Sequence, residues 1–246
     1  MNMLLEEVFS TRKFINSKGQ KLEIHGETSK GQCGFLQEII RNHKFTKSLE
    51  IGFAFGLSAL AIVEEIVKND GRRHCVIDKF QHADWGGNGL DLIRQSGYEE
   101  ELEFYEEYSY KVLPSLLSDG RRFDFVYIDS TKVFDWLLVD FFFIDKMLEI
   151  GGIIVFDDTG YFSIRKLARL IQGLPHYNVV GSYPENIKPS VLNRVTGFLT
   201  SVPPFRSVLK VGVSYTDYTK HINSGGCLAF QKTGEDQRDW KWHKEF

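Results

Sequence analysis

The stretch that decides the fold is Lys47-Ser-Leu-Glu-Ile-Gly-Phe-Ala-Phe-Gly-Leu-Ser58. Apolar residues alternate before its first glycine in the manner of a strand, and residues 57–67 are rich in good helix formers. Gly52 and Gly56 stand between the two segments, where the backbone needs conformations that glycine adopts freely. Because the first turn of a helix offers unpaired N–H groups, this strand, turn and helix predict a site for a small cofactor.

The spacing of the glycines argues against one common cofactor class. A dinucleotide fingerprint needs G-x-G-x-x-G, but Ala54 occupies the middle glycine position and Leu57 the third. A pyrophosphate cradle is therefore disfavoured, and with it an oxidoreductase that uses a nicotinamide cofactor.

Composition limits the classes of protein. The 246 residues are 42% apolar, with net charge −3 and a pI of about 6.2, so nothing indicates binding to nucleic acid or to an anionic membrane. Three widely separated cysteines predict neither a disulfide framework nor a zinc site, and they fit a reducing cytoplasm. We expect no signal peptide and no membrane span, hence a soluble cytoplasmic protein with one domain over 1–246.

One further position at a strand end suits a nucleoside ligand. Asp78 ends the short strand 74–77 and lies 26 residues after Gly52 (78 − 52), where a carboxylate can accept both hydroxyls of a ribose. The strand 102–105 is followed by Ser109, in a loop that leads into a helix. For Asp78, capping of the following loop is the plainer alternative.

Acidic residues follow two other predicted strands. Asp129 ends the buried strand 123–128 and precedes Lys132 by three residues, and Asp157 and Asp158 end the next strand. Three carboxylates from neighbouring strands could converge on one hard cation such as Mg²⁺. The alternatives are that the Asp157-Asp158 pair caps a helix, that Asp129 binds a cofactor ammonium without metal, and that Lys132 is a solvated surface lysine.

These motifs resemble those of a known family over residues 31–174. Glu50-x-Gly-x-x-x-Gly-x-Ser58 resembles motif I of class I S-adenosylmethionine-dependent methyltransferases, and Asp-x-x-Lys with Asp-Asp is similar to the metal-dependent catechol and caffeoyl-CoA O-methyltransferases. A bacterial group of small-molecule methyltransferases, with His in place of Lys132, is also similar. The resemblance implies S-adenosylmethionine contacts at Glu50, Gly52, Gly56, Ser58, Asp78, Ser109 and Asp129, and metal ligands at Asp129, Asp157 and Asp158.

The chain departs from the family pattern at two positions. Tyr108 stands where the family carries an acidic residue near the adenine, and Asp158 stands where the family usually carries Asn. The first departure weakens the adenine contact that can be named, and the second adds a negative charge.

Together these features predict a doubly wound, seven-stranded, mostly parallel α/β sheet of the Rossmann-like methyltransferase type. We expect methyl transfer to the hydroxyl of a small molecule, with Mg²⁺ lowering the pKa of the acceptor and Lys132 as general base. A metal-independent methyltransferase and a non-catalytic cofactor-binding relative are the alternatives. Residues 1–47 are expected to form a cap, with a polar, turn-rich stretch over 16–34 and a short amphipathic helix over 35–41. The two tryptophans of the tail, Trp240 and Trp242, suggest docking on the body or on a partner. The insertion 182–226 suits a substrate lid or a subunit contact. A homo-oligomer is therefore one of the possible states of the protein.

Overall fold

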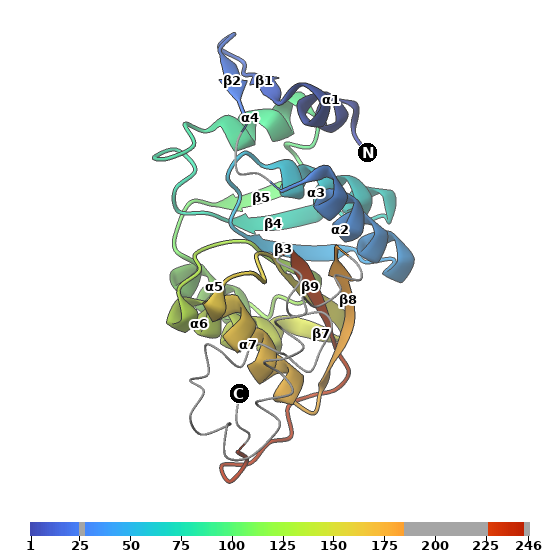
Figure 1. The fold of residues 1–246 in the computed structure, drawn as a ribbon, viewed down its shortest axis with the longest axis vertical. Coiled ribbons are helices and arrows are strands. Elements are labelled where there is room, and N and C mark those ends of the chain that lie inside the picture. Colours follow the sequence, from blue (N-terminus) through green and yellow to red (C-terminus); the bar gives the residue numbers. More distant parts are fainter. Residues whose placement is uncertain (25–27, 185–225, 244–246) are drawn as a thin grey trace, which may run out of the picture.

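The computed structural model describes residues 1–24, 28–184 and 226–243. Its main sheet has seven strands in the order β5-β4-β3-β6-β7-β9-β8, with helices on both faces (Figure 1). All neighbours are parallel except β9, which runs antiparallel between β7 and β8. This confirms the predicted doubly wound sheet. The strands are β3 (Lys47–Ile51), β4 (Arg73–Ile77), β5 (Leu102–Tyr105), β6 (Phe123–Ile128), β7 (Leu148–Phe156), β8 (Tyr177–Tyr183) and β9 (Cys227–Lys232).

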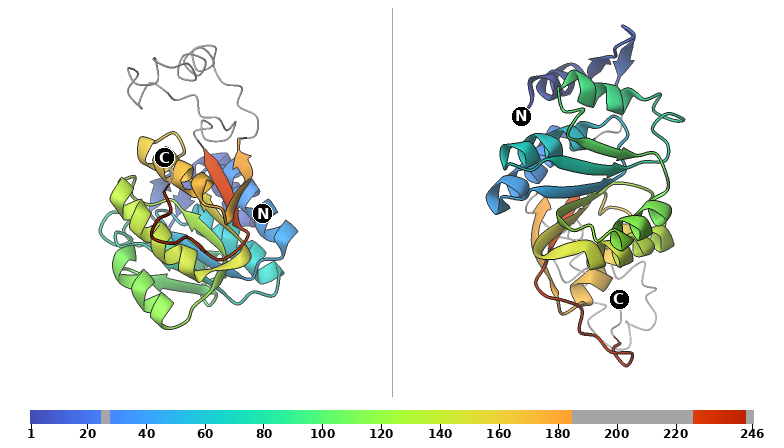
Figure 2. Two further views of the ribbon diagram at one scale, coloured as in Figure 1. Left: turned by 90° about the horizontal axis from the view of Figure 1, so that it is seen from below. Right: turned by 180° about the vertical axis from the view of Figure 1, so that it is seen from behind.

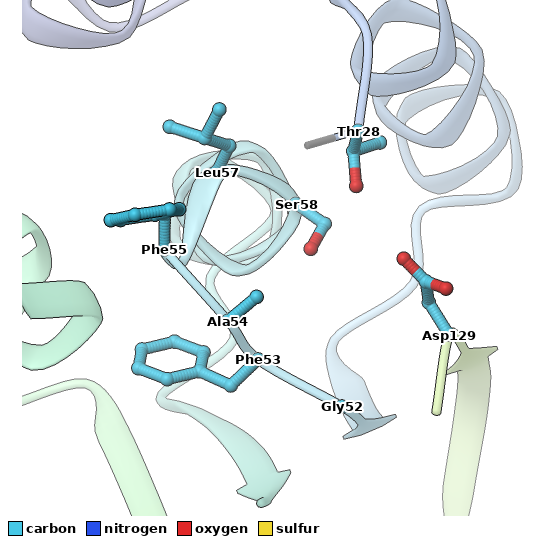
Figure 3. A pocket seen from close by; sticks show the side chains of 8 residues that line it. All are labelled: Thr28, Gly52, Phe53, Ala54, Phe55, Leu57, Ser58 and Asp129. Atoms are coloured by element: carbon cyan, nitrogen blue, oxygen red, sulfur yellow. The ribbon is translucent and has the colours of Figure 1, made fainter. Parts of the chain in front are cut away.

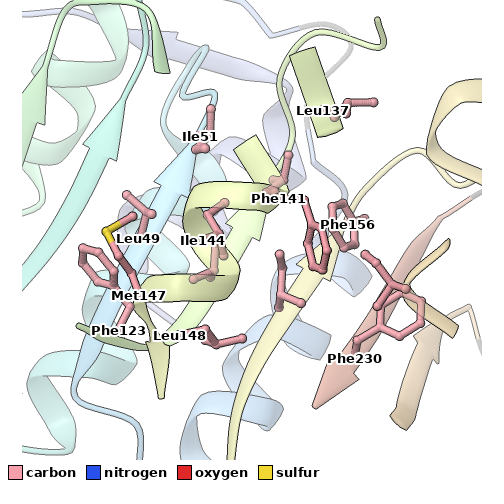
Figure 4. Packing of buried hydrophobic residues seen from close by; sticks show 14 of the residues in the cluster. Leu49, Ile51, Phe123, Leu137, Phe141, Ile144, Met147, Leu148, Phe156 and Phe230 are labelled. Carbon is pink, nitrogen blue, oxygen red and sulfur yellow. The ribbon is translucent and has the colours of Figure 1, made fainter. Parts of the chain in front are cut away.

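The two faces of the sheet are covered by different groups of helices, as the end-on and rear views show (Figure 2). One face packs on α5 (Ser109–Ser118), α6 (Phe134–Met147) and α7 (Phe162–Gly173); the other packs on α1 (Met3–Thr11), α2 (Lys30–His43), α3 (Leu57–Lys68) and α4 (Asn88–Gln95). Because side chains alternate along a strand, apolar residues face both layers. Figure 4 shows the packing beneath the first face.

The largest core cluster illustrates why these residues form strands and helices. Leu49 and Ile51 of β3 pack with Phe141 and Ile144 of α6, and each is less than a tenth exposed. The β3 pair is two residues apart and the α6 pair three residues apart. These are the spacings that keep side chains on one face of a strand and of a helix. This packing fixes the carboxyl end of β3, where the glycine turn begins.

The N-terminal region is more regular than the sequence indicated. The predicted polar, turn-rich stretch contains β2 (Lys21–Glu23), which pairs with β1 (Lys13–Ile15), and α2 begins at Lys30 rather than at Phe35. The helix starts early because Ser29 and Gln32 form a reciprocal capping box, with Gln32 N–H donating to Ser29 Oγ at 3.2 Å.

Part of the predicted insertion, 185–225, lies outside the described residues. In the tail, Trp242 packs against the main core whereas Trp240 is exposed, so one of the two tryptophans takes the first of the two predicted roles, docking on the body. Within the described ranges, every helix is too short or too polar to cross a membrane.

Candidate active site

Two adjoining cavities open at the carboxyl ends of β3, β4 and β6. The smaller is lined by Thr28 and the glycine turn, and in Figure 3 the oxygens of Thr28, Ser58 and Asp129 face a common space. The larger has a volume of about 350 Å³, which falls in the usual range for small-molecule sites. The cavities share four residues: Gly52, Phe53, Ala54 and Asp129.

The glycine turn forms the floor of both cavities. Gly52 has φ of +93°, and a Cβ added there would collide with the backbone carbonyl of Asp129. Gly56 has φ of +75° and immediately precedes α3. Ala54, at the position where a dinucleotide fingerprint has glycine, also lies in the left-handed region with φ of +48°. The turn therefore keeps a glycine-like conformation at a residue that the sequence pattern marked as a departure.

Asp78 lines the larger cavity, and it also holds the turn in shape. Its Oδ2 accepts the backbone N–H groups of Phe53 at 2.9 Å and Ala54 at 3.1 Å, and Oδ1 accepts that of Phe80 at 2.7 Å. Asp78 therefore caps the loop, as the alternative predicted, and it also lines the cavity where the ribose was predicted to bind. Any ligand hydroxyl would share this carboxylate with the backbone.

Glu50 is not among the residues that line either cavity, so its contact with a cofactor stays a prediction. The side chain is fully buried, and Ser58 Oγ donates to its Oε1 at 2.5 Å. His74 Nε2 lies 2.7 Å from Glu50 Oε2, and the other ring nitrogen lies 2.9 Å from Ser48 Oγ. Glu50 thus anchors the first turn of α3 from below, and its negative charge is enclosed by its own partners.

Ser109 lies in the wall of the larger cavity at the start of α5, among aromatic side chains of which the sequence singled out only Tyr108. Tyr108 meets Phe80 and Trp136 edge to face, with ring centroids 6.0 and 5.9 Å apart. The sequence could have indicated Trp136, because this residue lies in the first turn of the helix that follows the Asp129 loop. These rings give the cavity apolar faces on which a planar base can stack.

Asp140 is a buried carboxylate on α6, behind this wall. The side chain is 1% exposed, and neither carboxylate oxygen has a hydrogen-bond partner within standard distances among the described residues. Burial raises the pKa of Asp140 to about 6, and only the nearby Ser109 hydroxyl acts in the opposite direction. The Asp140 carboxyl beside the Ser109 segment therefore keeps its proton to a higher pH than an exposed aspartate does.

Lys132 points inward and joins two of the predicted site residues. Its Nζ donates to Asp129 Oδ1 at 2.7 Å and lies 3.2 Å from Asp158 Oδ2. The Lys132 carbonyl accepts the Ser163 hydroxyl of α7, which fixes the loop. Because Lys132 is about a fifth exposed and tied to both carboxylates, it is not a solvated surface lysine.

The charges in this group shift one another's pKa values. Burial opposes the ammonium of Lys132, but the carboxylates of Asp129 and Asp158 outweigh it and raise the pKa of Lys132 overall. Burial raises the pKa of Asp129 to about 6, against the lowering effect of Lys132 and with the further raising effect of Asp157. Lys132 is thus held as an ammonium, the protonation state opposite to the one that a general base needs.

Asp157 is turned away from this ion pair. The side chain is 4% exposed; its Oδ1 accepts from Gln32 Nε2 at 2.7 Å, and its Oδ2 accepts from the Tyr127 hydroxyl at 3.0 Å. Asp157 and Asp158 do not cap α7, because that helix begins at Phe162 with Tyr161 at its N-cap. The capping alternative is therefore wrong.

The three predicted metal ligands fit a cation only in part. Asp129 and Asp158 share one positive group, the Lys132 ammonium, so two carboxylates converge on one point. Asp157 already uses both oxygens toward neutral donors, and in the described part of the chain the three carboxylates do not form a set with ligand atoms mutually within 4.8 Å. A complete set of three oxygen donors is not present in this arrangement.

Comparisons with known proteins agree with this geometry. Residues 49–159 match a family model described as a methyltransferase domain. The caffeoyl-CoA O-methyltransferase of Populus kitakamiensis is 27% identical over 162 residues, which are 63% of this chain and 62% of that protein. The flavonoid 3',5'-methyltransferase of Vitis vinifera is 27% identical over 133 residues, 52% of this chain and 53% of the relative. The chain therefore spans little more than half the length of these relatives.

Solved structures share the fold at low identity. An O-methyltransferase from Bacillus cereus, in complex with S-adenosylhomocysteine, is 19% identical with a TM-score of 0.61 and covers 73% of this chain and 83% of its own. The O-methyltransferase TomG from Streptomyces achromogenes, in complex with S-adenosylmethionine, is 15% identical with a TM-score of 0.62 over 95% of this chain and 91% of its own.

Proposed function

We propose that this chain, whose residues 49–159 match a methyltransferase domain, is a class I methyltransferase that transfers a methyl group from S-adenosylmethionine to a hydroxyl of a small molecule. The observation that carries the proposal is the position of Asp129. Its side chain lines both cavities and also pairs with Lys132, so a cofactor pocket and a charged group suited to an acceptor oxygen share one wall.

The glycine turn supports the cofactor part of the proposal. Its backbone makes a floor that a Cβ at Gly52 would disrupt, and the aromatic wall around Tyr108 suits an adenine. S-adenosylmethionine, when bound, supplies an electrophilic methyl group on a positively charged sulfur. The Asp129 carboxylate at the shared wall attracts positive charge, whereas Glu50 is buried beneath the turn.

The acceptor part of the proposal depends on the Lys132 ion pair. A hydroxyl attacks a methyl group far better as it loses its proton, so the site must stabilise negative charge on oxygen and accept that proton. As an ammonium, Lys132 can donate to the developing oxyanion, and the carboxylates of Asp129 and Asp158 are the adjacent proton acceptors. The base role predicted for Lys132 would require it to lose a proton that both carboxylates help it to keep.

Metal assistance is the finer part of the proposal and the part that the site supports least. Asp129 and Asp158 could hold a divalent cation together only if Lys132 gave up its place between them, and Asp157 would have to leave Gln32 and Tyr127. We therefore derive no chemical step through a metal. The inward position of Asp157 favours the second candidate, a metal-independent O-methyltransferase.

Calorimetry with S-adenosylmethionine tests the cofactor pocket. We expect binding to the wild type and loss of binding in Gly52→Ala, because the new Cβ meets the Asp129 backbone. Gly19→Ala is the matched control: Gly19 also has positive φ, but nothing lies within 4 Å of its added Cβ. A wild type that binds NADH and ignores S-adenosylmethionine would overturn the proposal.

Turnover tests the reaction. S-adenosylhomocysteine formation is measured with a panel of phenols and sugar alcohols, in Mg²⁺ and in EDTA. Activity that persists in EDTA supports the metal-independent candidate, and activity restored only by Mg²⁺ supports metal assistance. Cofactor binding without turnover on any hydroxylated compound would instead indicate a non-catalytic relative.

A further inference from the structure

A second cluster of charged side chains lies at the opposite edge of the sheet from the cavities. Asp145 is in the last turns of α6, His176 directly precedes β8, and Asp236 follows β9. Their ligand atoms all lie within 4.8 Å of one another, the one such set of three acidic, His or Cys side chains in the described parts of the chain. Because α6 and β9 run back from the carboxyl ends of the parallel strands, the cluster is separated from the active site by the length of the sheet.

His176 is the feature that calls for a ligand. The residue is 4% exposed, and neither ring nitrogen has a hydrogen-bond partner among the described residues. Its Nε2 lies 3.5 Å from Asp145 Oδ1, so the ring faces the cluster. Buried polar atoms are nearly always satisfied, and an imidazole with both nitrogens unpaired lacks the interactions that would compensate for its burial.

The two carboxylates are held in place by other groups. The Tyr177 hydroxyl donates to Asp145 Oδ1 at 2.9 Å. Arg238 donates to both oxygens of Asp236, through Nε at 2.7 Å and Nη2 at 2.6 Å. Ligands of protein-bound metals are commonly oriented by such neighbours, which reduces the cost of ordering them when an ion binds.

The charges around the cluster allow a cation. Asp145, Asp236 and Glu235 bring three negative charges against the two positive charges of Lys232 and Arg238. Lys232 Nζ is directed mainly to the backbone carbonyl of Asp145 at 2.6 Å and stays 3.9 Å from that residue's carboxylate. With His176 neutral, the sum is −1, and a divalent ion brings it to +1.

We propose that Asp145, His176 and Asp236 bind a divalent transition-metal ion of the zinc type, at a structural site independent of the active site. An imidazole nitrogen with two carboxylate oxygens is a donor set that zinc accepts, and water can complete a tetrahedron. The ion connects three segments that are distant in sequence. It fixes the residues after β9 to α6 and to the start of β8, on the side where Trp242 already packs on the core.

Cobalt titration of the tag-free full chain tests the site, because Co²⁺ in a four-coordinate site absorbs visible light. We expect one equivalent of Co²⁺ to bind with a visible spectrum, Zn²⁺ to displace it, and Zn²⁺ to raise the Tm. Asp236→Asn and His176→Gln should each weaken the apparent Kd at least tenfold. Asp236 is exposed, so its variant tests the site even if His176→Gln folds poorly.

Two controls separate this site from others. His43→Gln alters an exposed histidine that stacks on Phe45, and it should leave the Co²⁺ spectrum unchanged. The double variant Asp157→Asn, Asp158→Asn should also keep the spectrum, since those residues belong to the active site. No Co²⁺ uptake by the wild type, or undiminished uptake in both His176→Gln and Asp236→Asn, would overturn the proposal.

Discussion

Glu50 and Asp129 are carboxylates of neighbouring strands, but the structure gives them opposite surroundings. Glu50 lies within β3, paired in register with residues of β4 and β6, and its side chain enters the layer beneath α3, where Ser58 and His74 enclose it. Asp129 comes one residue after β6 ends, and its side chain faces the cavities and Lys132. A carboxylate inside a strand is thus committed to structure, and one just past the strand end is available to a ligand.

The largest effect on activity should come from replacing Lys132, the residue that pairs with Asp129. Lys132→Met removes the positive charge beside the acceptor, and we expect kcat for methyl transfer to fall roughly 10³-fold, the loss typical of a removed electrostatic donor. Lys132→Arg keeps the charge but cannot act as a base at neutral pH. If Arg retains at least a tenth of the activity, Lys132 acts by charge; if Arg is as inactive as Met, it acts as the base.

Glu50→Ala should affect stability instead. The change leaves His74 and Ser58 without their buried partner, and we expect the free energy of unfolding to fall by about 3 kcal/mol. Urea denaturation measures it. Ser48→Ala, which touches only the far end of the network, should cost less. If Glu50→Ala is as stable as the wild type but no longer binds the cofactor, Glu50 serves the ligand and not the fold, contrary to the comparison with Asp129.

Asp140 gives the smallest effect and a pH dependence. Its folded pKa of about 6 lies above its ordinary value, so between pH 4 and pH 6 the folded state holds a proton that the unfolded state has lost. The free energy of unfolding therefore falls as pH rises through this window, by up to about 3 kcal/mol.

Asp140→Asn removes this dependence. The variant should be more stable than wild type at pH 8 by about 1–3 kcal/mol and equal to it at pH 4, as measured by urea midpoints at the two pH values. Equal midpoints for both proteins at pH 8 would mean that the carboxyl is solvated or partnered in solution.

Much of the fold could be predicted because its signals are local. The strands 102–105 and 123–128 are confirmed to the residue, since charged residues stand directly before and after each of them. The early start of α2 was missed because the capping box at Ser29 lies in a stretch that otherwise has the composition of a turn. Local composition does not report a reciprocal contact between two side chains.

The site was only partly predictable, because direction matters as much as position. The sequence places Asp157 beside Asp158, but Gln32 and Tyr127 draw Asp157 inward from elements far along the chain. Likewise, the sequence places Trp136 in the first turn of the helix after the Asp129 loop, but only the packing of α6 against α5 brings its ring against Tyr108 in the cavity wall. Residues brought together by packing stay hidden until the fold is known.

The place of β9 in the sheet has a consequence for how the chain acquires its structure. This strand is inserted between β7 and β8. Among the strands that the structure describes, β7 therefore has one open edge and β8 has no neighbour until residues 227–232 have left the ribosome. The nascent chain must hold the buried residues of β7, such as Ile153 and Val155, without their final partner while residues 184–226 are being made. Open strand edges invite pairing with other chains. The last of the described strands of this sheet to be synthesised is thus the one that fills the gap between β7 and β8, and a stop in translation before it would leave an aggregation-prone edge.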